Sequence, residues 1–146
     1  MSNASDICAA RIIRLNIEGF RADAYDDATG KLIECAGNAT IGYGCACRAW
    51  SRNLARAVLG FQLVEFEVSL LQESWYIGCN DARRSGLLEI AFNQGDAGLE
   101  DGYPKMIAAI KADDWEVAAA ECTVRQDVLK ARYERIGKIL LTGVDQ

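Results

Sequence analysis

Three residues in the first third of the chain combine the side chains that cleavage of a glycosidic bond requires. Glu18 follows a predicted helix, Asp27 lies nine positions later in a turn-rich stretch, and Thr40 opens a predicted strand. Two carboxyl groups facing each other across a cleft divide the work of a glycosidase. One donates a proton to the leaving oxygen, and the other activates a water or attacks the sugar. A threonine hydroxyl beside them would orient that water.

The same residues have a simpler interpretation, which their spacing alone leaves open. Asp26 and Asp27 belong to the sequence "DDATG", and acidic residues are common in such turns because their side chains bond to nearby backbone groups. Glu18 would then be a surface residue at a helix end. The elements around these residues therefore have to be considered before a function is assigned.

The elements predicted near the three residues are one helix and a small ribbon. Residues 5–17 carry apolar side chains near a period of 3.6, which predicts a helix with Asn3 or Ser5 as its cap. In residues 24–44, turn sequences flank "KLIEC" and "TIGYG", which predicts an antiparallel ribbon of two or three short strands. Such a ribbon is marginal alone and needs a helix to pack on.

The chain from about residue 50 onward has a helical pattern. The predicted helices cover residues 50–58 (ending before Gly60), 62–77, 81–94, 104–112, 114–123 and 125–143. Asp81 is a candidate N-cap, Gly95 a helix stop and Pro104 a helix start. We therefore expect an α+β fold in a single domain of residues 1–146. Its β-containing lobe would span about 18–60, and its helical lobe 1–17 plus about 61–146.

Composition and charge exclude several classes of protein. The 146 residues are 51% hydrophobic with one proline, as in a core-forming domain, and no apolar run is long enough to span a membrane. We find no secretory signal pattern. The net charge of −5 argues against nucleic-acid binding and against a general attraction to anionic surfaces. Local basic patches remain open around Arg83–Arg84 and residues 125–138.

The absence of histidine narrows the chemistry further. It removes histidine-containing zinc sites, Ser-His-Asp triads and Cys-His dyads. The six cysteines leave a four-cysteine zinc site formally open, but their spacing lacks a C-x-x-C pair. Buried thiols, with or without one disulfide, are the simpler interpretation. We expect no metal and no organic cofactor.

Four segments of the sequence resemble one known family. "EGFRADAYDDATG" followed by "TIGYG" resembles the phage-type lysozymes, the muramidase family of T-even phage lysozymes (glycoside hydrolase family 24). Glu18-Gly19, Tyr25 to Asp27 and Thr40 to Gly44 carry this motif, with the nine-residue interval of the family. Residues 81–98, 103–121 and 131–143 are similar, in order, to the later helices of that family. The resemblance covers most of the chain.

The resemblance implies a set of roles. Glu18 matches the general acid, and Asp27 and Thr40 match the residues that position water. The family suggests that the reaction inverts the anomeric configuration. Asn93 matches a cleft-lining amide, and Arg132 matches an arginine that contacts the catalytic glutamate. Glu89 lies one turn before Asn93 on the same helix face, so it is expected to face the cleft or to pair with a neighbouring arginine.

The resemblance also implies a substrate, a location and two rival functions. The substrate would be the glycan strands of peptidoglycan, reached from the host cytoplasm through a membrane lesion made by a holin. A monomer without stable membrane insertion is expected. The rivals are a non-catalytic glycan-binding module and a lytic transglycosylase of the same fold.

The chain departs from the family pattern in a few places, and its tryptophans carry expectations of their own. Cys45 stands where many family members have a histidine, and the pI of about 4.8 is unlike that of the basic members. Trp75 and Trp115 lie on apolar helix faces and are expected in the core, whereas Trp50 is open.

Overall fold

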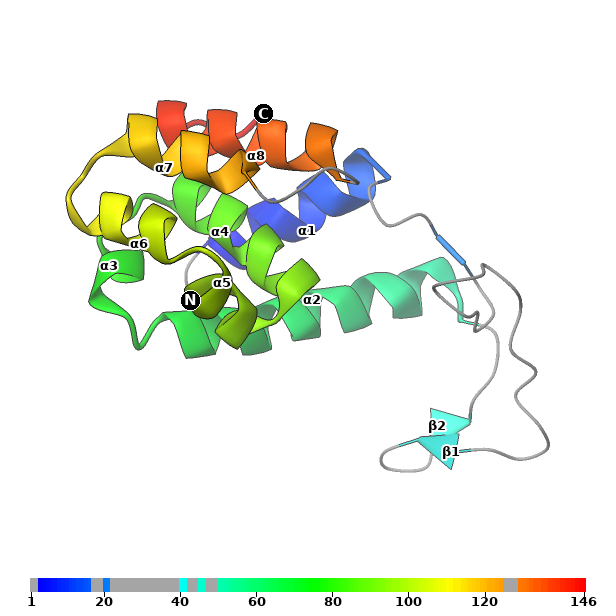
Figure 1. Cartoon of the computed structure of the whole chain (residues 1–146). Helices are drawn as coiled ribbons and strands as arrows, with labels where there is room; N and C mark the ends of the chain where they lie inside the picture. The colour runs from blue at the N-terminus through cyan, green and yellow to red at the C-terminus, as the bar shows by residue number, and fades with distance from the viewer. Residues whose placement is uncertain (1–2, 17–19, 22–39, 42–44, 47–49, 125–128) are drawn as a thin grey trace.

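The computed structural model describes residues 3–16, 20–21, 40–41, 45–46, 50–124 and 129–146. Most of these residues are helical (Figure 1). The helices are α1 (Ala4–Arg14), α2 (Arg52–Leu70), α3 (Ser74–Ile77), α4 (Asp81–Gln94), α5 (Asp96–Gly102), α6 (Pro104–Lys111), α7 (Trp115–Thr123) and α8 (Lys130–Thr142). The strands are β1 (Thr40–Ile41) and β2 (Cys45–Ala46).

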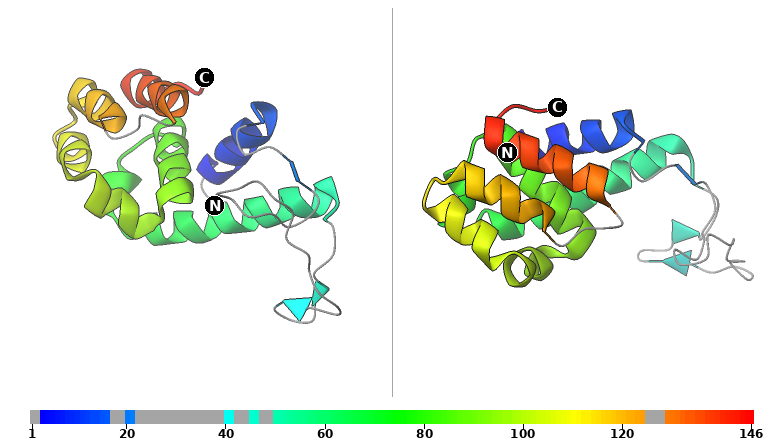
Figure 2. Two further views of the ribbon diagram at one scale, coloured as in Figure 1. Left: turned by 45° about the vertical axis from the view of Figure 1, so that its right-hand side comes forward. Right: turned by 45° about the horizontal axis from the view of Figure 1, so that its top comes forward.

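Helix α4 is the centre of the helical body. It contacts α1, α2, α5 and α8, while α6, α7 and α8 pack against one another in succession (Figure 1; Figure 2). All seven residues from 85 to 91 are buried, so the middle of α4 has no solvent face. The middle of the helix can therefore carry polar groups only on a buried surface, and its two ends are the parts that solvent reaches.

The expectation of an α+β fold is wrong. The described part of the chain is overwhelmingly helical, and strand pairing there is limited to Thr40 with Ala46 and Ile41 with Cys45. Two strands of two residues bury no face of their own, so they cannot form a layer of the core. The apolar core instead comes from the helices. The predicted strand "KLIEC" lies outside the described residues.

Helix α2 replaces two predicted helices. The sequence predicted a break at Gly60, but one helix runs from Arg52 to Leu70, and the short α3 follows it. Glycine costs helix stability without removing a backbone hydrogen bond, so it does not by itself end a helix. Ser51 caps the start, because its side chain accepts from the Leu54 N–H at 3.2 Å. The predicted lobe boundary near residue 60 thus falls inside a continuous helix.

The other helix ends agree with the sequence in part. Pro104 starts α6 and Gly95 ends α4, both as predicted. The cap of α4 is Asn80 rather than Asp81, since its Oδ1 accepts from the Arg83 N–H at 2.9 Å. Helix α1 ends at Arg14, earlier than predicted, and Asn16 follows with a φ of 50°. Helix α5, which reads as a turn in the sequence, was missed.

The core buries one tryptophan and three thiols. Trp75 is buried as predicted, whereas Trp115 is half-buried. Cys8, Cys79 and Cys122 are buried free cysteines, which confirms the prediction of buried thiols for these three. Burial raises the pKa of Cys8 and Cys122 to about 12 and that of Cys79 to about 11. Among the described helices, none is long and apolar enough to cross a membrane.

Candidate active site

Of the three predicted catalytic residues, the structure describes one. Glu18 and Asp27 lie outside the described residues. Thr40 is described only through its place in β1, opposite Ala46. The roles of these three residues therefore stay predictions.

The structure brings together the three predicted substrate-binding residues. Glu89 and Asn93 lie one turn apart on α4, and Arg132 of α8 contacts both. Its Nη1 donates to Asn93 Oδ1 at 3.0 Å, and its Nε lies 3.7 Å from Glu89 Oε1. The spacing of four residues places the first two on one helix face, as the sequence predicted. Arg132 thus joins α8 to the buried surface of α4.

Glu89 is the centre of a buried ion cluster. Its side chain is 1% exposed, and its Oε2 accepts from Arg11 Nε at 2.9 Å. Its Oε1 accepts from Arg135 Nη2 at 2.5 Å. Of the two expectations for Glu89, pairing with neighbouring arginines is the one observed. A carboxylate enclosed by three guanidinium groups has little room for a substrate contact.

Arg11, in the N-terminal helix α1, connects this cluster to Asp145 near the C-terminus. The side chain is 0% exposed, and it donates from Nη1 to Ser85 Oγ at 2.9 Å and from Nη2 to Ser85 O at 2.8 Å. It also pairs with the carboxylate of Asp145. Burial lowers the pKa of Arg11, but the charge of Glu89 and the hydrogen bonds to Asp145 and Glu89 together outweigh this, so the pKa is raised. Arg11 therefore stays a cation inside the protein.

Asn93 is held in a fixed orientation by a second contact. Its Nδ2 donates to the Tyr133 hydroxyl at 3.2 Å, and Gln94 Nε2 donates to the same oxygen at 3.2 Å. Tyr133 is itself buried and stacks on Tyr103 with 6.2 Å between ring centroids. The amide oxygen of Asn93 consequently points at Arg132 and its nitrogen at Tyr133. This side chain is preorganised.

Sequence reasoning missed Arg11, Arg135 and Asp145. A signal was present for the first of them, because Arg11 lies on the same face as the buried residues Cys8 and Ile12. A charged residue on the apolar face of a helix requires a buried partner. Nothing in the local sequence names that partner, which is 78 positions away.

Arg83 and Arg84 of α4, where the sequence left a local basic patch open, pack against the helical body. Arg83 Nε donates to Leu140 O at 2.9 Å, and its guanidinium carbon lies 3.7 Å from the centroid of the Trp115 ring. Arg84 Nε donates to Tyr76 O at 3.1 Å. Both cations are thereby tied to the helical body.

No described residues form a metal site. Within the described ranges, no group of three or more histidine, cysteine, aspartate or glutamate residues could hold a metal ion.

Comparison with known proteins places this helical chain among enzymes that degrade bacterial cell walls. The phage lysozyme family model matches residues 15–134, a range that includes all six predicted site residues. The chain therefore belongs to the phage lysozyme family and is a peptidoglycan-lytic enzyme of the glycosidase type. No curated protein matches it.

Proposed function

We propose that this protein is an N-acetylmuramidase that hydrolyses the β-1,4 bond between N-acetylmuramic acid and N-acetylglucosamine in peptidoglycan. The family match over residues 15–134 supports this proposal, and Glu18, Asp27 and Thr40 lie within that range at a spacing that resembles the family motif. We assign Glu18 as the general acid. Asp27 and Thr40 position the attacking water.

The proposed reaction is a single displacement. Glu18 donates its proton to the glycosidic oxygen as the bond to the anomeric carbon breaks. The ionised Asp27 accepts a proton from a water on the opposite face of the sugar, and Thr40 orients that water. The water oxygen then bonds to the anomeric carbon, which inverts the configuration of the product.

Asn93 and Arg132 are the proposed substrate-binding residues. Their mutual hydrogen bond of 3.0 Å and the contact of Asn93 with Tyr133 support a rigid binding surface. We do not extend this role to Glu89, whose carboxylate is enclosed by arginines. Glu89 instead fixes the position of Arg132.

The biological setting is part of the same proposal. A chain of residues 1–146 would fold as one domain and act as a monomeric endolysin. It would be made in the host cytoplasm and reach the wall after a holin opens the membrane. The family match supports the wall as its place of action.

The test measures the reducing sugar released from purified, lipid-free peptidoglycan. Glu18→Gln and Asp27→Asn should each lower the rate by at least about a hundredfold, because each removes a group that transfers a proton. Glu116→Gln, an exposed residue of α7, is the matched control and should retain full activity. Circular dichroism of each variant checks that it is folded.

The products separate the rival functions. Newly released α-anomers would support inversion, and β-anomers would contradict it. Anhydro sugars would identify a transglycosylase. A wild type that binds glycan without cleaving it would identify a binding module. Full activity in Glu18→Gln would overturn the assignment of the general acid.

A further inference from the structure

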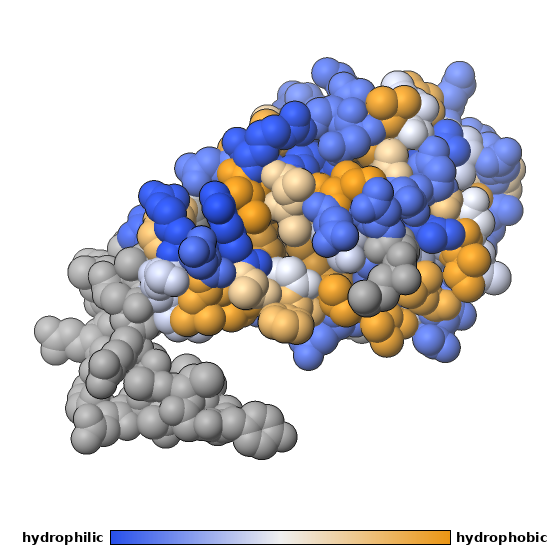
Figure 3. All heavy atoms as spheres, turned by 180° about the vertical axis from the view of Figure 1, so that it is seen from behind, coloured by the Kyte–Doolittle hydropathy of each residue, from blue (hydrophilic) through white to orange (hydrophobic). Residues whose placement is uncertain are grey.

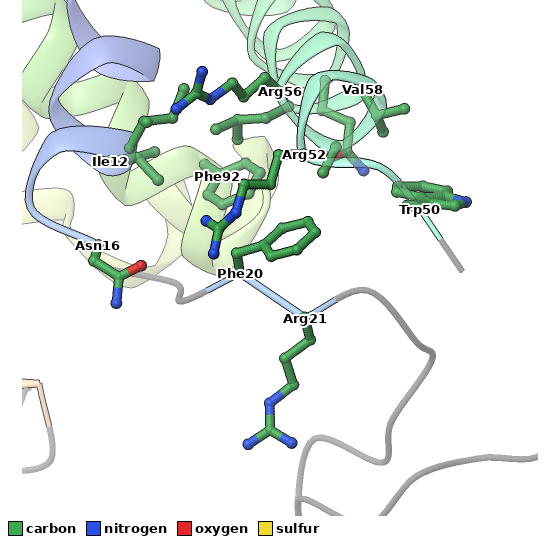
Figure 4. A pocket seen from close by; sticks show the side chains of 13 residues that line it. Ile12, Asn16, Phe20, Arg21, Trp50, Arg52, Arg56, Val58 and Phe92 are labelled. Carbon is green, nitrogen blue, oxygen red and sulfur yellow. The ribbon is translucent and has the colours of Figure 1, made fainter. Parts of the chain in front are cut away.

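Asn93 lies in the last turn of α4, where consecutive side chains are directed to different parts of the molecule. Hydrophilic and apolar side chains are mixed on the face of the body that Figure 3 shows, so surface hydropathy does not single out a binding site there. The contacts beneath the surface are more specific. Phe92 lines the pocket beside α1 and α2 (Figure 4) and packs edge-to-face on Phe66, with ring centroids 6.4 Å apart. Asn93 instead points to α8.

The chemistry of its two partners fixes the orientation of the Asn93 amide. An arginine can only donate hydrogen bonds, so the Asn93 atom that lies 3.0 Å from Arg132 Nη1 must be the oxygen. The nitrogen then lies 3.2 Å from the hydroxyl oxygen of Tyr133, to which it donates. A flipped amide would place its NH₂ group against the N–H donors of Arg132. The amide therefore has one favourable orientation.

The hydroxyl group of Tyr133 is held in place by the core. The residue is fully buried, and its ring stacks on that of Tyr103 with 17° between the planes. Only two rotatable bonds join a tyrosine ring to its backbone. The oxygen accepts from Asn93 Nδ2 and from Gln94 Nε2, both at 3.2 Å. Tyr133 thus offers Asn93 an acceptor that can hardly move.

The other anchor of Asn93 depends on the buried ion cluster. Arg132 donates to the amide oxygen, and its Nε lies 3.7 Å from Glu89 Oε1. Without the Tyr133 hydroxyl, the oxygen of Asn93 would still be held, but its nitrogen would lose its partner. The terminal torsion of an amide side chain is broad when nothing restrains it. The Tyr133 hydroxyl is therefore the group that limits rotation of this amide.

Asn93 keeps hydrogen-bonding capacity for a ligand. A primary amide has two N–H donors and two oxygen lone pairs. Within the described part of the chain, only Arg132 and Tyr133 bond to this side chain, so one donor and one lone pair are left. The residue is half-buried, and solvent reaches it. A neutral group that both donates and accepts, such as a sugar hydroxyl, matches these two sites.

We propose that Tyr133 is a positioning residue for substrate binding, because its hydroxyl holds the Asn93 amide in the orientation that meets the glycan. Tyr133 itself is too deeply buried to touch the substrate. This inference rests on the proposed role of Asn93 in binding peptidoglycan. It extends that role to a side chain inside the core, which acts only through Asn93.

The first test measures hydrolysis of soluble peptidoglycan fragments by Tyr133→Phe. Phenylalanine keeps the ring and its stacking on Tyr103 and removes only the hydroxyl group. KM should rise about fivefold, the equivalent of one hydrogen bond, and kcat should stay within about twofold of the wild type. This split is expected because Asn93 would bind the substrate and the transition state alike.

Tyr76→Phe is the matched control for the loss of a buried hydroxyl. Tyr76 is also fully buried, and its hydroxyl donates to Arg84 O at 3.4 Å rather than contacting Asn93. Its removal should lower the stability to a similar degree but leave KM unchanged. An equal rise of KM in both variants would assign the effect to lost stability and overturn the proposal.

A double-mutant cycle shows whether Tyr133 acts through Asn93. Asn93→Ala should raise KM by itself, and adding Tyr133→Phe should raise it no further, because the side chain that Tyr133 positions is gone. Additive effects of the two changes would give Tyr133 a separate role. A wild-type KM in Tyr133→Phe alone would also contradict the proposal.

NMR relaxation of side-chain amides tests the positioning without catalysis. The Nδ2 group of Asn93 should have a high order parameter in the wild type and a lower one in Tyr133→Phe. Asn80, whose Nδ2 donates to Gly143 O at 3.0 Å, is the internal control and should not change. Unchanged order at Asn93 would overturn the proposal. A wild type that cleaves no peptidoglycan would instead refute the proposed hydrolase, and the order of Asn93 would still decide whether Tyr133 positions it.

Discussion

At the scale of single residues, the buried charges are the most constrained part of the molecule. The side chain of Glu89 is 1% exposed, and among the described residues three guanidinium groups stabilise its charge. Burying an ion costs several kcal/mol, and this is offset only when every partner is present. The arginines therefore depend on one shared carboxylate, and removing Glu89 takes that countercharge from all three.

Glu89→Gln should be strongly destabilising. The change leaves Arg11 and Arg132 buried without their shared countercharge, and such a loss costs about 3–5 kcal/mol. Chemical denaturation measures the free energy of unfolding. Glu116→Gln, which removes an exposed carboxylate on α7, should stay within about 0.5 kcal/mol of the wild type. A cost below about 1 kcal/mol for Glu89→Gln would contradict the cluster as described.

At the scale of elements, two helical glycines have such different surroundings that replacing each with alanine should change the stability in opposite directions. A Cβ added to Gly60, inside α2, would meet no atom within 4 Å, whereas a Cβ added to Gly137 of α8 would lie 3.1 Å from Ala119 O. The first glycine only weakens its helix, and the second allows α7 and α8 to approach each other closely.

Gly60→Ala should stabilise the protein by about 0.5–1 kcal/mol, because alanine loses less conformational freedom in a helix. Gly137→Ala should destabilise it, since the backbone carbonyl of Ala119 must move or α7 must shift. Thermal unfolding of both variants, compared with the wild type, gives the two signs. A loss of stability in Gly60→Ala would show that α2 does not run unbroken through that position.

The sequence predicts helix existence better than helix ends. The apolar periods locate α6 and α8, because each buries one continuous face. The break at Gly60 was predicted wrongly, since local propensity was given more weight than the packing that spans it. The α+β class was also wrong. Turn sequences mark where strands are allowed, but not how many residues will pair.

Residues of the candidate site could be predicted only where they matched the family resemblance or shared a helix face with a residue that did. The proximity of Glu89, Asn93 and Arg132 follows from a one-turn spacing and from the matched arginine. The contacts of Arg11 with Glu89 and Asp145 span 78 and 134 positions. No local pattern encodes pairs so distant. They follow from packing α1 against α4 beside the end of α8.

At the scale of the whole molecule, three thiols from separate elements lie in one core. Cys8 comes from α1, Cys79 from the link between α3 and α4, and Cys122 from α7. Burial raises the pKa of all three, so the folded protein keeps them protonated at a pH where the unfolded chain has ionised them.

Stability should therefore fall at alkaline pH. Below pH 9 the thiols are protonated in both states and contribute no slope. Between pH 9 and about 12 the folded state holds more protons, so the free energy of unfolding decreases as pH rises. At pH 11 this amounts to on the order of 2 kcal/mol for Cys8 and for Cys122.

Denaturation curves at pH 8 and pH 11 measure this effect. A variant with Cys8, Cys79 and Cys122 all replaced by alanine provides the comparison, since other groups that titrate in this range are unchanged in it. Its stability should depend less steeply on pH than that of the wild type. Parallel profiles for the two proteins would contradict the burial of the thiols.

The Arg11 cluster also bears on the order in which the chain folds. Helices α6, α7 and α8 are neighbours in both sequence and space, so they can associate after short loops close. The contacts of Arg11 must instead wait for partners 78 and 134 positions away, because long loops close at a higher entropic cost. The ion cluster is thus a late event in folding and an early one to be lost in unfolding. Weakening the ion cluster should therefore mainly raise the unfolding rate and should change the folding rate little.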